Sequence, residues 1–302
     1  MSSVPRTETM AKRQRDNIII QTHTQNERIL YIFTTRKPKT NLSEGLAYRG
    51  LHDPMKPPPK HGSTSRSAMR IDEYFDGIYL LNLDKRPKRL ALADKRMRMC
   101  NINYTRFGAT DGSVMRRIWM SYARNNTYFT NPNYLACAIS HLAIYKDALE
   151  KGHQRILVVE DDNRIRYDAN ALFSKAIDGV PPTWELLYLG FIPLNDDQSL
   201  WNYNVFQIIG DNVALARNFW GLFGYGITAA VMNETLDAYD RDFPVELDRY
   251  LVSRIQSRNK SYGIVPQIFA ADDGVSDNSG RNEQGMLRRS IDARFGTVDD
   301  YA

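Results

Sequence analysis

Long apolar runs and cysteines are both scarce in this sequence. No stretch approaches the roughly 18–20 uninterrupted apolar residues that a membrane-spanning helix needs, and the first residues lack the apolar segment of a secretory signal peptide. The two cysteines, Cys100 and Cys137, cannot form a disulfide framework. The C-terminus carries no retrieval or lipidation motif. We therefore expect a soluble, cytoplasmic protein without a transmembrane segment.

Acidic residues are scarce in the first quarter of the chain. Residues 1–70 hold 13 Lys/Arg against 5 Asp/Glu, whereas the remaining residues hold 27 against 30. The pI near 9.0 therefore reflects the N-terminal segment and is weak evidence that the protein as a whole binds nucleic acid, which we do not expect as a partner. This segment could tether the protein to an anionic surface or be a solvated arm, which is the more common role of a charge run. Its apolar stretches at 17–20 and 29–34 could pair with a second subunit in a homo-oligomer.

Linker-like sequence ends close to residue 72. Residues 36–70 are rich in Pro, Ser and Lys, a composition typical of a connecting segment. We predict a basic N-terminal extension over 1–71, a folded domain over 72–285 and a C-terminal tail over 286–302, in which residues 288–302 are expected to be poorly ordered.

Within the folded domain, short apolar stretches alternate with amphipathic ones. We predict strands at 77–83, 104–109, 155–162, 184–190 and 262–268, and helices at 84–99, 131–150, 169–177 and 247–257, with a long loop over 191–220. Strands joined by helical crossovers form parallel sheets. The sequence therefore predicts an α/β fold with a mainly parallel central sheet.

The stretch 155–162 is the most informative. Four apolar residues, three of them β-branched, read as a strand buried on both faces, and Glu160, Asp161 and Asp162 follow at once. Ligands bind at the carboxyl ends of strands in open α/β sheets. Clustered carboxylates favour a hard divalent cation, although a solvated acidic turn would have the same composition.

Four cations, Lys85, Arg86, Lys88 and Arg89, crowd the start of the first predicted helix, which Asp84 is expected to cap. Cations at a helix N-terminus oppose the macrodipole. An anionic ligand such as a diphosphate would explain them, and a basic surface without a ligand is the equal alternative.

Ser140 and His141 fall in the middle of the predicted helix 131–150, whose apolar residues recur at helical spacing. A lone histidine in this position is more often a satisfied structural residue than a ligand.

Several stretches, taken in order, resemble glycosyltransferase family 25, which includes lipooligosaccharide galactosyltransferases and the collagen galactosyltransferase group. They are Asn-Leu-Asp-Lys-Arg-Pro at 82–87, Cys-Ala-Ile-Ser-His-Leu at 137–142 and Val-Glu-Asp-Asp at 159–162, continued by 184–190, 224–230, 245–251 and 275–277. The resemblance covers about residues 75–280.

This resemblance implies a GT-A-type, Rossmann-like domain that binds a nucleotide-sugar. It implies a UDP-sugar donor, Mn²⁺ or Mg²⁺, a glycan or glycoconjugate acceptor, and inversion at the anomeric carbon. The implied metal ligands are Asp162, Asp161 and His141, with Asp277 as a further residue near the metal or donor. The implied donor contacts are Asn82, Asp84, Arg86, Arg89, Glu160, Asp161 and Ser140, and the implied catalytic base is Asp248 or, second, Glu246. A bacterial or viral cytoplasmic enzyme fits these features.

The sequence also departs from the family pattern. An acidic residue and a glycine usually precede the Cys-Ala-x-Ser-His segment, and Tyr134 and Ala136 stand there instead. A catalytically decayed member that binds a glycan or a protein partner is therefore the main alternative, with the basic N-terminal arm on an anionic surface.

Overall fold

The structure is a computed structural model that describes residues 68–123, 131–194, 207–241, 245–280, 282, 284–291 and 296–302. The apolar stretches predicted at 17–20 and 29–34, and most of the predicted N-terminal extension, lie outside the described residues. Within the described part, no helix is long and apolar enough to cross a membrane.

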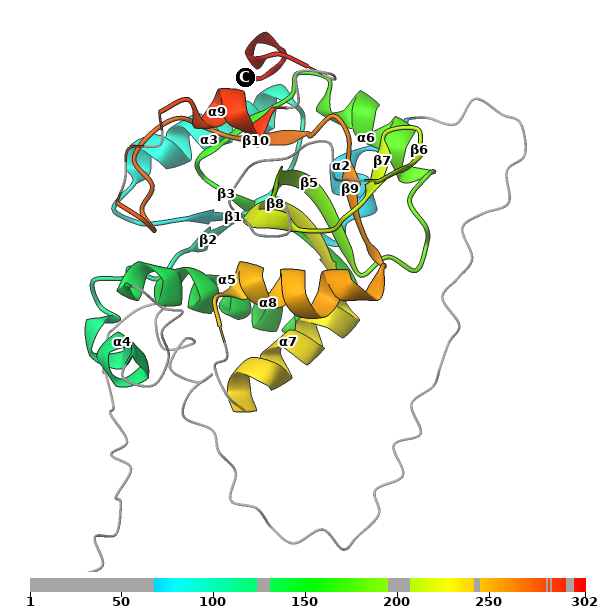
Figure 1. The fold of residues 1–302 in the computed structure, drawn as a ribbon. Helices are drawn as coiled ribbons and strands as arrows, with labels where there is room; N and C mark the ends of the chain where they lie inside the picture. The colour runs from blue at the N-terminus through cyan, green and yellow to red at the C-terminus, as the bar shows by residue number, and fades with distance from the viewer. Residues whose placement is uncertain are drawn as a thin grey trace, which may run out of the picture. The chain divides into compact units, whose positions relative to one another are not determined.

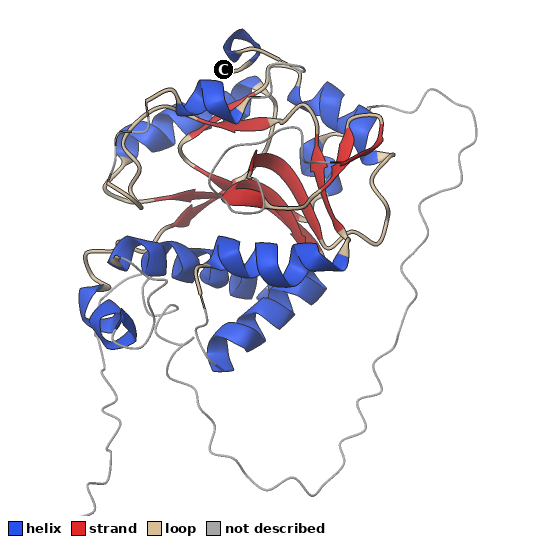
Figure 2. Cartoon of the chain, in the orientation of Figure 1, coloured by secondary structure: helices blue, strands red, loops and turns tan. Residues whose placement is uncertain are grey.

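An eight-stranded sheet forms the centre of the described domain, in the order β2-β1-β3-β8-β5-β9-β7-β6 (Figures 1 and 2). Its strands are β1 (Gly77–Asn82), β2 (Thr105–Gly108), β3 (Arg155–Glu160), β5 (Leu186–Pro193), β6 (Gln207–Gly210), β7 (Val213–Leu215), β8 (Phe219–Thr228) and β9 (Ser261–Ile264). β1 pairs in parallel with β2 and β3, and β5 with β9. β8 and β7 run opposite to the other strands. The predicted α/β class and mainly parallel strand direction are confirmed.

Helices cover both faces of this sheet (Figure 1). One face carries α5 (Pro132–Glu150), α7 (Ala229–Arg241) and α8 (Leu247–Tyr250), and the other α3 (Pro87–Met99), α6 (Ala169–Ile177) and α9 (Met286–Ser290). The short α2 (Ile71–Tyr74) contacts α6, and α4 (Arg116–Ala123) contacts α5. Because both faces are covered, the central residues of β3 are fully buried, as its apolar sequence predicts.

The ends of α5 follow from local chemistry. The Asn131 side chain accepts hydrogen bonds from the backbone N–H groups of Asn133 and Tyr134, and Pro132 opens the first turn. Gly152 then adopts a φ of 77°, a left-handed conformation that ends the helix.

The start of α3 differs from the prediction. Arg86, not Asp84, is its N-cap residue, and it makes no side-chain cap hydrogen bond. The Asp84 carboxylate instead pairs with the Arg106 guanidinium on β2. An ion pair across the sheet has replaced the expected local cap.

Two further expectations about the chain were wrong. Residues 191–220 were predicted as a long loop, and 195–206 lie outside the described residues. In the described part, β5 extends to Pro193, and β6 and β7 form a hairpin at the sheet edge. The end of the chain, expected to be poorly ordered, contains α9 and a 3₁₀ turn at Val298–Asp300. Tyr301 is 3% exposed, and its hydroxyl donates to the Gln267 carbonyl at 2.7 Å.

A small second sheet pairs β4 (Asn163–Ile165) with β10 (Phe269–Ala271) in antiparallel fashion. β4 follows the turn after β3, and β10 directly precedes residues 272–280. The pairing therefore brings residues 272–280 close to the acidic end of β3.

Gly190 on β5 lies where the main sheet packs closely against β10. A Cβ there would lie 2.7 Å from the Phe269 carbonyl oxygen, whereas a Cβ on Gly210 of β6 would meet nothing within 4 Å. We expect Gly190→Ala to destabilise the fold by about 1–3 kcal/mol through overpacking. Thermal unfolding should show a midpoint about 3–10 °C lower, with Gly210→Ala near wild type. Equal midpoints for the two variants would contradict this packing.

Candidate functional site

A pocket opens where the carboxyl ends of β1, β2 and β3 meet. It has a volume of about 760 Å³, including its open mouth. Its polar lining includes Asn82, Lys85, Arg89, Thr110, Asn133, Cys137, Ser140, Glu160, Asp161, Asp162 and Asp277. The structure thus brings the acidic end of β3 and the basic start of α3 to one edge, where open α/β sheets bind ligands.

Asn82, at the end of β1, orients the middle carboxylate. Its side chain is buried, and its Nδ2 donates to Asp161 Oδ2 at 2.6 Å. Its Oδ1 accepts from the Arg106 guanidinium at 3.0 Å, so both ends of the amide are held. The predicted residue Asp84 lies outside this lining with a side chain 79% exposed.

Arg89 is shared among three carboxylates. Its Nη1 lies 3.5 Å from Asp161 Oδ1, 3.3 Å from Asp162 Oδ2 and 3.2 Å from Asp277 Oδ2. Arg86 Nε also donates to both Asp277 oxygens at 3.1 Å. These carboxylates offset the cost of cations at a helix N-terminus. They also anchor the segment that carries Asp277.

Asp161 and Asp162, the carboxylates after β3, are partly buried and repel one another and Glu160. Burial, followed by the charges of Glu160 and Asp161, raises the pKa of Asp162 to about 7. Burial also raises the pKa of Asp161, although the Asn82 hydrogen bond and Arg89 oppose this shift. The cluster therefore lacks compensating positive charge, and its oxygen donors fit a hard divalent cation.

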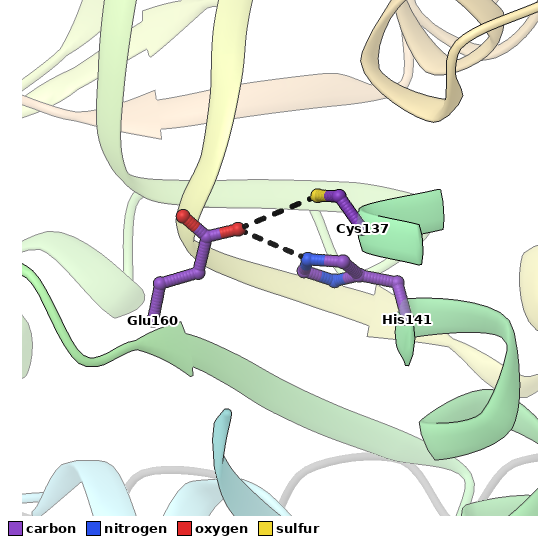
Figure 3. Close-up of side chains that lie close together, drawn as sticks. All are labelled: Cys137, His141 and Glu160. Atoms are coloured by element: carbon purple, nitrogen blue, oxygen red, sulfur yellow. Dashed lines mark hydrogen bonds and ion pairs between the residues drawn. The ribbon is translucent and has the colours of Figure 1, made fainter. Parts of the chain in front are cut away.

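His141 lies apart from those two aspartates. Its Nδ1 is 2.9 Å from the Tyr225 hydroxyl, and its Nε2 is 3.1 Å from Glu160 Oε1. Figure 3 shows Cys137 beside it, with Sγ 3.9 Å from the same Glu160 oxygen. Within the described ranges, this trio is the one set of three or more His, Cys, Asp or Glu ligand atoms that all lie within 4.8 Å of one another. The ligand atoms of the predicted metal trio, Asp162, Asp161 and His141, do not all lie within this distance of one another.

Ser140 has a structural task. Its hydroxyl donates to the Ala136 carbonyl at 2.7 Å and accepts from the Thr110 backbone N–H at 2.9 Å. These two hydrogen bonds hold the segment after β2 against α5. Ser140, predicted as a donor contact, therefore lines the pocket, but its hydroxyl is already hydrogen-bonded within the protein.

The two candidates for the catalytic base lie at the start of α8. Asp248 Oδ1 accepts from the Arg249 backbone N–H at 2.8 Å, and Glu246 lies 3.6 Å from the Arg249 guanidinium. Burial raises the pKa of both carboxyls. The charge of Glu160 adds to the rise for Asp248, although neither Asp248 nor Glu246 is among the residues that line the pocket.

Sequence reasoning missed several residues of the pocket. Asn133 Nδ2 donates to the Asp277 carbonyl at 2.7 Å, and Asn131 Nδ2 to the Asn278 carbonyl at 3.0 Å, so the start of α5 holds residues 277–278. The buried Thr110 hydroxyl has no partner among the described residues. The spacing of Cys137 and His141, four residues apart on one helix, would have indicated that they share a face.

Comparisons with known proteins agree with the sequence resemblance. The model of glycosyltransferase family 25 (LPS biosynthesis protein) matches residues 75–250. Procollagen galactosyltransferase 2 of Homo sapiens is 26% identical over 135 residues, which cover 38% of this chain and 21% of that protein. Inactive glycosyltransferase 25 family member 3 of Mus musculus is 22% identical, over 56% of this chain and 32% of that protein. The chain thus spans a third or less of these relatives' lengths.

A solved structure gives a weaker match. A glycosyltransferase involved in the glycosylation of the major capsid of PBCV-1 has 11% sequence identity and a TM-score of 0.34, over 63% of this chain and 81% of that one.

The raised pKa of Asp162 predicts a stability gain when its charge is removed. The native state holds a proton that the unfolded chain releases above about pH 4. Stability is therefore lost as the pH rises toward the native value of about 7. In EDTA at pH 8 we expect Asp162→Asn to stabilise by about 1 kcal/mol, since a side chain 39% exposed is partly screened.

Thermal unfolding at pH 8 and pH 5 measures this difference, and the gain should shrink at pH 5. Asp240→Asn, at an exposed position on α7, is the control and should be neutral at both pH values. A midpoint of Asp162→Asn at or below wild type at pH 8 would contradict the electrostatic strain.

Proposed function

We propose, because the chain belongs to glycosyltransferase family 25, that it transfers a sugar from a UDP-sugar to a glycan or glycoconjugate acceptor, with a divalent cation and with inversion. The observation that carries this proposal is the pocket in which Arg89 meets Asp161, Asp162 and Asp277 at the ends of β1 and β3. A nucleoside diphosphate needs both features, a cationic side chain for its phosphates and carboxylates for its metal.

Asp161 and Asp162 are the residues that would hold Mn²⁺ or Mg²⁺. Both carboxyls have raised pKa values, and Arg89 is divided among three carboxylates, so the cluster has room for further positive charge. When bound, the cation supplies Lewis-acid stabilisation to the leaving diphosphate. His141 is left out of this set because its ring nitrogens face Tyr225 and Glu160.

Cationic side chains of the protein would also stabilise the charge that develops during transfer. Breaking the anomeric bond leaves negative charge on the UDP leaving group. Arg89 already lines the pocket, and Lys85 lines it while pairing with Asp111 at 2.7 Å. We infer that a diphosphate draws Arg89 from its carboxylates, since charge-assisted contacts to phosphate oxygens are strong.

Asp248 is the proposed base for the acceptor hydroxyl. Inversion in one step needs a carboxylate within hydrogen-bond reach of that hydroxyl, on the side of the sugar opposite the leaving group. Burial and the charge of Glu160 raise the pKa of Asp248, which makes it a stronger base when ionised. Glu246 is the second candidate, and its contact with Arg249 suits it to orient the segment.

Galactose is the proposed sugar because a relative is named procollagen galactosyltransferase. Other relatives are named as inactive members, so a decayed site that only binds a glycan or partner is the second candidate. The carboxylates and arginines of the pocket favour the active enzyme. Binding of a UDP-sugar without turnover would favour the inactive one.

Donor binding can be tested by thermal unfolding with UDP or UDP-galactose, each with and without Mn²⁺. A ligand at 100 times its dissociation constant stabilises the native state by about 2.7 kcal/mol, so we expect an Mn²⁺-dependent rise of several degrees. Asp161→Asn combined with Asp162→Asn should abolish the rise. The matched control combines Asp237→Asn and Asp240→Asn, two exposed positions on α7, and should keep it. An unchanged shift in the first double variant would remove the proposed cation site.

The assignment of the base makes a separate prediction. Asp248→Asn should lower kcat by about 10²–10⁴-fold, the usual contribution of general-base catalysis, with the donor-induced thermal shift unchanged. Glu246→Gln should cost less, because its carboxylate is assigned a positioning task. Rates are measured as UDP release with a range of acceptors. A larger loss in Glu246→Gln than in Asp248→Asn would reverse the two roles.

A further inference from the structure

Cys137, His141 and Glu160 converge from two elements onto one small space (Figure 3). Cys137 and His141 are four residues apart on α5 and so project from the same face. Glu160 comes from the end of β3. The transfer proposed above assigns no task to the thiol or the imidazole. We propose that these three residues bind a thiophilic divalent cation of the Zn²⁺ class.

The distances suit a tetrahedral ion. Bond lengths of about 2.0 Å to nitrogen or oxygen and 2.3 Å to sulfur give ligand-to-ligand separations of roughly 3.3–3.6 Å. Glu160 Oε1 lies 3.1 Å from His141 Nε2 and 3.9 Å from Cys137 Sγ, which bracket those values. Shifts of a few tenths of an ångström along these two edges would therefore bring them to ligand spacing.

The imidazole also has the outer partner that metal-binding histidines use. Such a histidine usually holds its second ring nitrogen in a hydrogen bond, which sets the tautomer. Here Nδ1 faces the Tyr225 hydroxyl at 2.9 Å, and that hydroxyl lies 2.6 Å from the hydroxyl of Tyr145.

The two tautomers of the His141 imidazole both fit this chain of hydroxyl groups. When Tyr145 donates to Tyr225 and Tyr225 donates to Nδ1, Nε2–H donates to Glu160. When Nδ1–H donates to Tyr225 instead, Nε2 presents a lone pair toward Cys137 and Glu160. The second arrangement forms when Nε2 releases its proton toward the pocket and Nδ1 takes one up, and the two hydroxyl hydrogens rotate to match the new tautomer. A cation is thus accommodated without moving the buried ring.

The chemistry of the ligands separates this site from the donor cation. Thiolate and imidazole select Zn²⁺, whereas carboxylate and phosphate oxygens select Mn²⁺ or Mg²⁺. Cys137 and Glu160 line the pocket, which provides an entry path from solvent. A water molecule from the pocket would take the fourth position of a tetrahedral ion. The thiol proton passes to solvent as the cation binds.

Co²⁺ is the probe, because it takes zinc-like sites and reports thiolate ligation by a sulfur-to-cobalt charge-transfer band in the near ultraviolet. Titration of the full chain should give this band together with the visible bands of tetrahedral Co²⁺, and Zn²⁺ should displace both. Cys137→Ser should abolish the charge-transfer band. Cys100→Ser is the matched control, since that buried thiol donates to the Arg166 carbonyl away from the cluster, and it should keep the band.

Glu160→Gln provides a second variant that retains the thiol, and it should weaken Co²⁺ binding at least 10-fold. Thermal unfolding of each variant without metal checks that it is folded. The absence of a charge-transfer band in the wild type, or its persistence in folded Cys137→Ser, would overturn the proposal. The inference does not depend on glycosyl transfer. The Asp161→Asn, Asp162→Asn double variant should lose the UDP response and keep the Co²⁺ band, so the two proposals fail separately.

Discussion

Repulsion among the carboxylates at the end of β3 is the constraint around which the pocket is built. Glu160, Asp161 and Asp162 are adjacent, and burial strengthens their mutual repulsion. The Arg89 guanidinium on α3 offsets part of this negative charge, and the Asn82 side chain at the end of β1 donates a hydrogen bond to Asp161. Arg89, which is unfavourable at the start of an isolated helix, is thus explained by the carboxylates after β3, whereas Arg86 pairs with Asp277 and Lys85 with Asp111.

Helix α5 forms another wall of the pocket and holds several of its segments in place through hydrogen bonds. Ser140 clips the segment after β2, while Asn131 and Asn133 hold the backbone of residues 277–278. Cys137 and His141 meet Glu160 from the same helix. A change in the position of α5 would therefore be transmitted to three separate chain segments at once. This makes α5 the rigid support of a pocket otherwise made from strand ends and loops.

Local sequence patterns predicted the elements whose stabilising interactions are local. The strand at 155–160, the cap at Asn131 and the helix at Ala169–Ile177 follow from apolar periodicity and turn chemistry. The pairing of β4 with β10 and the burial of Tyr301 depend on residues more than 30 positions apart, which no local pattern encodes. Asp84 shows the same limit, since its partner Arg106 lies on another strand. For the site, residue types were predictable, but their partners were not.

Glu160 connects the two halves of the site. The carboxylates of Asp161 and Asp162, which follow it in the chain, meet Arg89, whereas its own Oε1 faces the sulfur of Cys137 and the nitrogen of His141. A carboxylate engaged by imidazole is less available to a hard cation, so the proposed donor-cation site rests on Asp161 and Asp162. Three consecutive acids are therefore not redundant. Because β3 ends at Glu160, Asp161 and Asp162 lie in the turn that follows and reach Arg89, whereas Glu160 reaches Cys137 and His141.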